Sequence, residues 1–291
     1  MNQFSGKTAV ISGGAEGIGL SIAKALAEQG MNLVLADIDE SNLEKAAAIL
    51  ADTGVETLTL KLDVANEAAW HDVAEQAQER FGKIHMVVNN AGVTGDPGPI
   101  ESQQSDSWQW TLDVNLMGVV YGAKAIVPLI KQHDEGGWIV NVASMAGMGG
   151  VPYSGAYTAT KAAVVALSES WAGELTKSNI KVSVLCPAFV KTRIHESYRN
   201  RPGHDNNGET SNEIANDRAA NTKSMVERGI DVDIVGKRVV EALLAGEMYI
   251  FTHPNYRSVI QHRSSAIDAA FERAAKSPLL KEIVDQEIDF L

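Results

Sequence analysis

Short runs of β-branched and aliphatic residues alternate with longer segments of helical periodicity along most of this chain. The first four runs are TAVIS, NLVLA, ETLTLKL and MVVNN, separated by segments such as IGLSIAKALAEQ and EAAWHDVAEQAQERF. This alternation is typical of strand–helix–strand units, because parallel neighbours need a crossover connection. Three further runs, WIVNVAS, KVSVLCP and EMYIFT, bring the expected strands to about seven. We therefore expect an α/β fold with a doubly wound parallel sheet and helices on both faces.

The spacing of apolar residues also predicts helices later in the chain, over residues 116–133, 157–175 and 232–245. Between His195 and Lys223 the sequence is polar, rich in asparagine and almost free of large aliphatic residues, so it cannot form a core element. A solvated insertion and a lid over the site, spanning about 193–228, both fit such a segment, and we favour the lid.

The end of the chain, about 254–291, is predicted to be a helical extension. It could pack on its own domain or on a neighbouring subunit through its apolar positions, which include Val259, Ile260, Ile267, Ala270 and Phe271. We take residues 1–291 as a single domain, because a chain of this length can bury one large core.

Charge and composition exclude several classes of partner. The chain carries 37 acidic against 25 basic groups, a net charge of −12, which disfavours binding to nucleic acid or to an anionic membrane. No apolar run approaches the ~20 residues of a membrane span, and the N-terminus lacks the features of a signal peptide. One cysteine, Cys186, excludes an intramolecular disulfide and a cysteine-based zinc cluster. We expect a soluble, cytoplasmic protein that acts on a small molecule.

A glycine-rich turn joins the first expected strand to the first expected helix. The segment TAVISGGAEGIGLSIAKAL contains Gly13, Gly17 and Gly19. Glycines there permit a tight turn and close approach of a pyrophosphate, whose oxygens the free amides of the helix would favour. A purely structural turn could leave the same pattern, but the position between strand and helix favours a dinucleotide and a Rossmann-type sheet.

The end of the second strand, LADID, bears on the choice of cofactor. It places Asp37 where a carboxylate can accept hydrogen bonds from an adenosine ribose. The same carboxylate would repel a 2′-phosphate, and neither Glu16 nor Ile38 supplies a basic group to bind one. We therefore predict NAD rather than NADP. Alternatively, Asp37 and Asp39 only cap the next helix, a role that Ser41 could fill equally well.

Tyr157 and Lys161, in the segment YTATK, stand four residues apart at the start of an expected helix. Positions four apart share a helical face, so the phenol and the ammonium can point into one site. A nearby cation lowers the pKa of a phenol from its usual value of about 10, which makes the tyrosine a candidate proton carrier. The same spacing occurs on solvated helices, so this interpretation depends on the other motifs.

Together, SGGAEGIG, the NNAG of residues 89–92 and the Y-x-x-x-K of residues 157–161 closely resemble motifs of the classical short-chain dehydrogenases/reductases. The resemblance covers about residues 4–192, and the last helix and strand more loosely. It implies a catalytic tetrad of Asn115, Ser144, Tyr157 and Lys161. It also implies a NAD site formed by Gly13, Gly17, Ile18, Gly19, Asp37, Asp63, Val64, Asn90, Ala91, Gly92, Tyr157, Lys161, Pro187, Val190 and Thr192. The segment CPAFVKT departs from the family at Ala188, where glycine is usual.

The resemblance assigns a task to each member of the tetrad. An alcohol must lose its hydroxyl proton as the hydride leaves for nicotinamide, and Tyr157 would be the base that takes it. Lys161 and the positive nicotinamide ring would lower the pKa of Tyr157, and Lys161 could also hold the nicotinamide ribose. Ser144 would orient the substrate oxygen. Asn115, expected at a helix start, would position a water that relays protons from Lys161.

Substrate contacts are less well specified. Met148 and Tyr153 lie between Ser144 and Tyr157, so we expect these four to contribute to substrate binding. The length of the chain, its PAFVKTRI…RNRP stretch and MYIFTHPNYR loosely resemble a bacterial subgroup of the family. That subgroup includes dehydrogenases of benzylic alcohols in lignin-derived aryl ethers, which suggests a bulky or aromatic alcohol.

Other candidate residues have ordinary explanations. Trp108 and Trp110 are explained equally well by a pocket or by helix packing. His195 and His204 lack a third ligand at suitable spacing, so we predict no metal site. Cys186 is expected to be a buried thiol rather than a nucleophile.

These expectations combine in a NAD-dependent dehydrogenase of a secondary alcohol, or a reductase of the corresponding ketone. Among enzymes the alternative is an NADPH-dependent 3-oxoacyl reductase, which Asp37 disfavours. Outside enzymes the alternative is a NAD-binding regulator, which has no use for an intact tetrad. The family resemblance further implies a homotetramer or homodimer formed through the helices that begin near Leu116 and Tyr157.

Overall fold

The computed structural model describes residues 3–203 and 213–287. These residues form two units, of which the larger ends at Thr252 and the smaller begins at His253. The larger unit holds seven strands: β1 (Thr8–Ser12), β2 (Asn32–Asp37), β3 (Thr57–Lys61), β4 (Met86–Asn89), β5 (Gly137–Val142), β6 (Ile180–Cys186) and β7 (Tyr249–Phe251).

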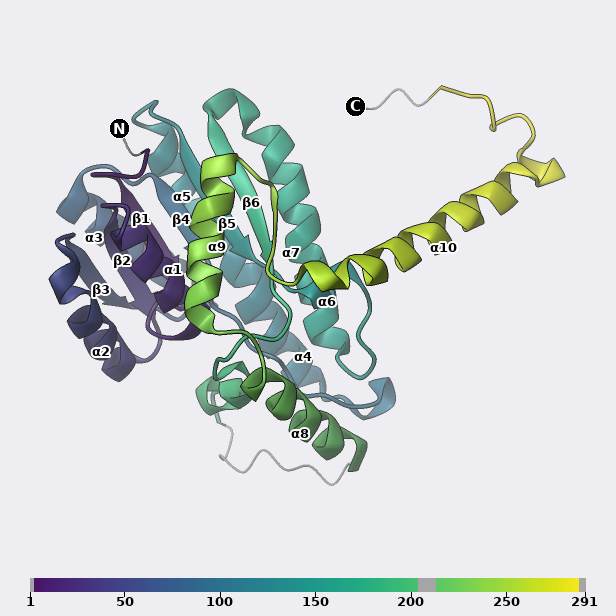
Figure 1. Ribbon diagram of the computed structural model, residues 1–291, viewed down its shortest axis with the longest axis horizontal. Coiled ribbons are helices and arrows are strands. Elements are labelled where there is room, and N and C mark those ends of the chain that lie inside the picture. Colours follow the sequence, from purple (N-terminus) through teal and green to yellow (C-terminus); the bar gives the residue numbers. More distant parts are fainter. Residues whose placement is uncertain (1–2, 204–212, 288–291) are drawn as a thin grey trace. The chain divides into compact units, whose positions relative to one another are not determined.

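The seven strands form one parallel sheet in the order β3-β2-β1-β4-β5-β6-β7 (Figure 1). The order reverses beside β1, whose last residue, Ser12, pairs with Ala36 of β2 on one side and Asn89 of β4 on the other. All residues of β1 and β5 are buried, as expected for strands covered on both faces. The predicted doubly wound sheet is confirmed.

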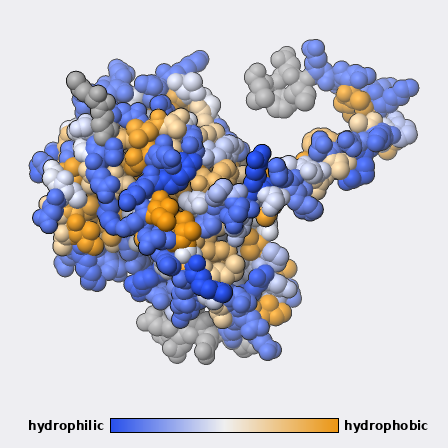
Figure 2. All heavy atoms as spheres, in the orientation of Figure 1, coloured by the Kyte–Doolittle hydropathy of each residue, from blue (hydrophilic) through white to orange (hydrophobic). Residues whose placement is uncertain are grey.

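Helices cover both faces of this sheet (Figure 1). One face packs against α1 (Gly17–Ala27), α2 (Glu40–Leu50) and α9 (Val232–Ala245), and the other against α3 (Glu67–Phe81), α5 (Gly118–Lys131) and α7 (Gly155–Glu174). Large side chains such as Ile22, Leu26 and Trp70 are fully buried there. Hydrophilic residues dominate the face of the larger unit shown in Figure 2. Shorter elements are η1 (Ala51–Thr53), η2 (Ile100–Ser102), α6 (Met145–Met148) and η4 (Thr176–Ser178).

The helix expected from Leu116 begins much earlier. α4 (Ser105–Leu112), a π-helical turn, η3 (Asp113–Met117), and α5 run on from one another. The prediction was wrong because a π-turn inserts one extra residue and shifts the apolar stripe, which hides the continuity from a 3.6-residue pattern. By length and composition this segment could cross a membrane, but Val119, Ile126 and Ile130 are buried, so it is a core helix of a soluble domain.

The expected lid contains two helical segments, η5 (Ile194–Asn200) and α8 (Glu213–Glu227), while residues 204–212, His204 included, lie outside the described residues. Two backbone hydrogen bonds connect the residues on either side of this segment: the Ile230 amide donates to the Phe189 carbonyl at 3.1 Å, and the Lys191 amide donates to the Ile230 carbonyl at 3.0 Å.

The smaller unit contains η6 (Pro254–Tyr256), α10 (Arg257–Ala275) and η7 (Pro278–Leu280). The expected helical extension is therefore present. None of the residues of α10 is buried, and the apolar Val259, Ile267 and Phe271 are exposed.

Candidate active site

A cavity of about 670 Å³ opens at the carboxyl ends of the central strands, where the strand order reverses. Ligands bind at this edge in doubly wound folds. Most of the residues predicted for cofactor and catalysis line it: Gly13, Gly17, Ile18, Asp37, Asp63, Val64, Asn90, Ala91, Gly92, Ser144, Tyr157, Lys161, Pro187, Val190 and Thr192. Gly19, Asn115, Met148 and Tyr153 are not among its lining residues.

The glycine-rich loop needs its glycines for two different reasons. Gly13 and Gly17 have φ of 61° and 57°, a conformation that side chains disfavour. At Gly19 the backbone leaves no space, because a Cβ would lie 2.1 Å from the carbonyl oxygen of Gly13. The side-chain amide of Asn90 supports the loop, because its Nδ2 donates to the carbonyls of Ser12 and Gly13 at 2.9 and 2.8 Å.

The start of α1 fits the phosphates of a dinucleotide. Its N-cap, Glu16, makes no side-chain capping bond, and the first turn contains no acidic residue, so the amide donors there stay available. At Gly17 a Cβ would touch only Thr192, at 3.5 Å and beyond, which leaves the loop open toward the cavity. A cradle of free amides with room above it is the arrangement that a pyrophosphate requires.

Asp37 does not cap the next helix. Its carboxylate accepts from the amides of Ala15 and Asp39, each at 3.1 Å, and thereby joins the ends of β1 and β2. Burial raises the pKa of Asp37, and the two amide hydrogen bonds work in the opposite direction. Asp39 is the cap of α2, because it accepts from the Asn42 amide at 3.0 Å. The two aspartates therefore have separate tasks, and Asp37 lines the cavity.

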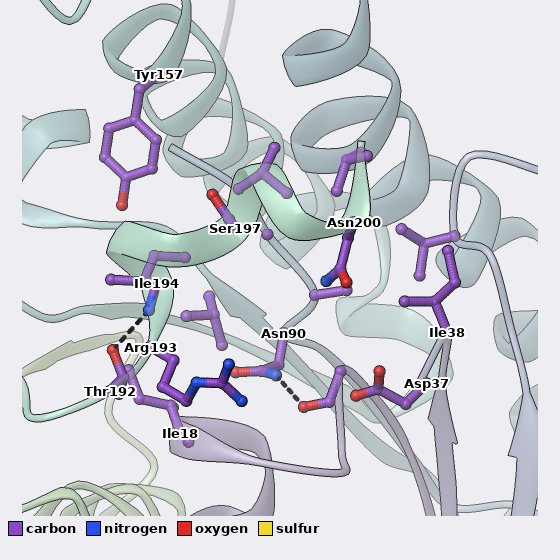
Figure 3. A pocket seen from close by; sticks show the side chains of 18 of the residues that line it. Ile18, Asp37, Ile38, Asn90, Tyr157, Thr192, Arg193, Ile194, Ser197 and Asn200 are labelled. Atoms are coloured by element: carbon purple, nitrogen blue, oxygen red, sulfur yellow. Dashed lines mark hydrogen bonds between the residues drawn. The ribbon is translucent and has the colours of Figure 1, made fainter. Parts of the chain in front are cut away.

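Ser144, Tyr157 and Lys161 meet at the other end of the cavity. Ser144 follows β5, and its hydroxyl accepts from the Ala146 amide at 3.1 Å. Tyr157 and Lys161 lie on one face of α7, with Nζ 5.7 Å from the centre of the phenol ring. The hydroxyl of Tyr157 points into the cavity (Figure 3). Lys161 is buried, and its Nζ donates to the Val142 carbonyl at 2.9 Å.

The protonation of these groups is controlled by burial. Burial raises the pKa of Tyr157 above its ordinary value, and the hydrogen bond with Ser144 lowers it in part. Burial lowers the pKa of Lys161 to about 8. The expected lowering of the Tyr157 pKa by Lys161 is not among the effects of the protein's own groups, because loss of solvation of the buried phenol outweighs the other effects and raises its pKa. The contribution expected from a positive nicotinamide ring stays a prediction.

Asn115 lies inside the π-helical turn and not at a helix start. Its side chain is fully buried and cross-links the site: Oδ1 accepts from the Val93 amide at 2.8 Å, and Nδ2 donates to the Val93 carbonyl at 2.8 Å and to Thr160 at 3.2 Å. The side chain is therefore engaged in holding the loop after β4 against α7. Its role in a proton relay stays a prediction.

Two expected substrate contacts lie elsewhere. Tyr153, with φ of 66°, lines a second, shallow hollow with Ile100 and Ile214. Met148 packs against an apolar cluster that contains Val164 and Cys186. Their role in substrate binding stays a prediction. Of the two tryptophans, Trp110 lines the main cavity and Trp108 does not.

Three arginines of the expected lid were not anticipated from the sequence. Arg193 and Arg199 line the cavity and both pair with Glu16 of the glycine-rich loop, the former at 3.5 Å. Arg201 is 7% exposed and lies between the carboxylates of Asp96 and Asp106, at 2.8 and 2.9 Å. The motif RNRP contains two of these residues, but a sequence does not indicate which carboxylates they meet.

One cluster with metal-ligand geometry, His85, His133 and Glu135, occurs among the described residues. Both ring nitrogens of each histidine are already hydrogen-bonded. His85 bonds Thr8 and Glu135, and His133 bonds Ile84 and the amide of Glu135. These bonds explain the cluster without a metal. In the lid, His195 has Glu196 as its neighbour at 3.7 Å.

Comparison with known proteins identifies the family of this chain. The model of a family described as short chain dehydrogenase matches residues 7–203. The Cα-dehydrogenase of Sphingobium sp. strain SYK-6 is 31% identical over 92% of this chain and 87% of its own. The CLA biosynthesis dehydrogenase/reductase of Lactiplantibacillus plantarum is 35% identical over 92% of this chain and 95% of its own.

Solved structures agree. A short chain dehydrogenase/reductase from Burkholderia phymatum in complex with NAD superposes with a TM-score of 0.88 at 35% identity, covering 93% of this chain and 97% of that one. LigO from Sphingobium sp. strain SYK-6 gives a TM-score of 0.80 at 29% identity over the full length of both chains. Fold and site define an NAD(P)-dependent oxidoreductase that acts on an alcohol or ketone. The chain belongs to the short-chain dehydrogenase family.

Proposed function

We propose that this protein is a NAD-dependent dehydrogenase of a bulky secondary alcohol, aryl carbinols included, or the reductase of the corresponding ketone. One observation carries the proposal: a single cavity has the glycine-rich loop and Asp37 at one end and Ser144, Tyr157 and Lys161 at the other. A regulator that only binds the dinucleotide would have no need for the second group of residues.

The dinucleotide, when bound, accepts or supplies the hydride. The chain itself handles the proton. The Tyr157 hydroxyl would take the proton from the alcohol oxygen, or return it in the reductive direction. Ser144, hydrogen-bonded to Tyr157, would hold the same oxygen and stabilise the charge that develops there. Lys161, whose pKa is near 8, can pass a proton onward at neutral pH.

The cofactor would be held by residues already in place. The amides at the start of α1 would bind the phosphates, and Asp37 would accept hydrogen bonds from the adenosine ribose. Asp63 and Val64 would hold the adenine, while the segment from Pro187 to Thr192 would contact the nicotinamide. Asp37 supports NAD because a 2′-phosphate would meet its carboxylate.

Two kinds of support suggest the substrate class. The relatives include a Cα-dehydrogenase, and the cavity extends to Trp110 and Val226 beyond the polar groups. The family resemblance also supports a homodimer or homotetramer in the cytoplasm. Light scattering on the purified protein would test the assembly.

The test follows the absorbance of reduced nicotinamide with purified protein, NAD or NADP, and a panel of secondary alcohols and ketones that includes aryl carbinols. We expect turnover with NAD, and we expect Tyr157→Phe to reduce kcat by at least about 100-fold. The matched control is Tyr249→Phe, which removes a phenol bonded to Glu169 at the surface. A Tyr157→Phe variant as active as Tyr249→Phe would contradict the mechanism, and a wild-type protein that binds neither cofactor would contradict the proposal itself.

A further inference from the structure

The segment after Thr192 crosses the cavity as a strap, which we define as residues 193–203. Figure 3 shows η5 passing from the Tyr157 end toward Ile38 and Asp37, with Ser197 and Asn200 along its course. The strap is held at its middle, where the Thr94 amide donates to Ser197 Oγ at 3.0 Å. It is held at its end by Arg201, between Asp96 and Asp106.

Two arginines of the strap, one before Ser197 and one after it, bring positive charge to the glycine-rich loop. Arg193 and Arg199 both pair with Glu16, and the Arg193 Nε also donates to Glu196 at 2.8 Å. Arg199 is well covered, at 22% exposure, and donates to the carbonyl of Arg193 at 3.2 Å. Two guanidinium groups therefore converge on one carboxylate at the entrance of an anion cradle.

This end of the cavity is rich in negative charge, which must be compensated before phosphates can bind. Glu16, Asp37 and Asp39 are three carboxylates that line the same end as Gly13 and Gly17. Two phosphates placed there would meet strong repulsion unless cations compensate it. Among the described lining residues, Lys161 lies at the catalytic end and Arg201 is already paired with two aspartates. Arg193 and Arg199 are the cations that remain.

We propose that Arg193 and Arg199 are phosphate-binding residues of the cofactor site, which leave Glu16 for the pyrophosphate when a dinucleotide binds. Glu16 then competes with the pyrophosphate for the two arginines and pairs with them at the entrance when no dinucleotide is bound. The guanidinium of Arg193 already extends into the cavity between Thr192 and Asn90 (Figure 3). This inference rests on the proposed function, because it requires a dinucleotide in the cavity.

The proposal predicts effects of opposite sign. Arg193→Gln and Arg199→Gln should each raise the Kd of NADH about tenfold, because a charge-assisted bond to phosphate is lost. Glu16→Gln should lower that Kd about threefold, because the competing carboxylate is gone. Adenosine, which has no phosphate, should bind all variants within about twofold of the wild type.

The measurement is a fluorescence titration with NADH, repeated with adenosine as competitor, on variants whose circular dichroism matches the wild type. The matched control is Arg238→Gln, since Arg238 also meets two carboxylates, Glu241 and Glu247, far along the chain on α9. If Glu16→Gln raises the Kd of NADH as the arginine variants do, the ion pairs only hold the strap in place and the inference is overturned. If wild type binds NADH and all three variants match Arg238→Gln, the inference alone fails; if wild type binds neither NADH nor NADPH, the proposed function fails with it.

Discussion

Gly19→Ala is the substitution whose effect can be worked out most directly from the structure. A Cβ at Gly19 would lie 2.1 Å from the carbonyl oxygen of Gly13 and 2.6 Å from Nδ2 of Asn90. Because ordinary contacts begin near 3.4 Å, the helix and the loop must separate by about an ångström. Neither can yield by a simple side-chain rotation, since the closest atom belongs to the backbone.

The cost has two parts. Overpacking of this kind costs about 1–3 kcal/mol, and the gain of alanine over glycine in a helix, at most about 1 kcal/mol, offsets part of it. We expect the free energy of unfolding to fall by about 1–2 kcal/mol. The displaced carbonyl belongs to the loop that would bind the phosphates, so the Kd of NADH should rise more than about tenfold.

Urea denaturation and an NADH titration would measure the two effects. The control is Gly173→Ala on α7, because a Cβ at Gly173 meets nothing within 4 Å. We expect this variant to be as stable as the wild type or slightly more so, with unchanged affinity. A Gly19→Ala protein that matches Gly173→Ala in both measurements would refute the reasoning.

Two further substitutions test the proposed role of Asp37 and the effect of a buried histidine on stability. Asp37→Ser should raise the ratio of kcat/KM for NADP over NAD at least about tenfold. Asp231→Ser, which alters the cap of α9 and does not line the cavity, should leave that ratio unchanged, and equal ratios in the two variants would exclude the role given to Asp37. Burial lowers the pKa of His85 below its ordinary value of 6.5, against the effect of Glu135, so the unfolded chain takes up more protons and stability falls as the pH decreases from 6.5. His85→Asn should flatten that decline in urea midpoints while the exposed His71→Asn keeps it, and a decline that persists in His85→Asn would show another origin.

The sheet and most helices could be predicted from local pattern. The expected helix 232–245 coincides with α9, and the expected start of α7 is wrong by only two residues. Runs of β-branched residues bounded by polar turns leave little choice when both faces of a sheet are covered. The glycine-rich loop could be predicted for the same reason, since its residues are adjacent in the chain.

The features that were missed depend on contacts between distant residues. Arg199 and Glu16 are 183 positions apart, and many other carboxylates could have been partners of that arginine. Tyr153 lies between Ser144 and Tyr157 in the sequence, yet it has a left-handed backbone and lines a different hollow, while its role in substrate binding stays a prediction. Where the backbone turns sharply, the position of a residue in the sequence is a weak guide to where its side chain points.

The π-turn at Asp113–Met117 allows the position of Asn115 and the packing of α5 in the core to be set independently. Its extra residue carries Asn115 to the loop after β4, yet α5 continues beyond it with Ile126 and Ile130 in the core. Loss of one residue within the turn would restore an ordinary helix and could leave that core intact, while the link from Asn115 to Val93 would be broken. A single deletion could thus release the loop after β4 from Asn115 and still leave a well-folded scaffold.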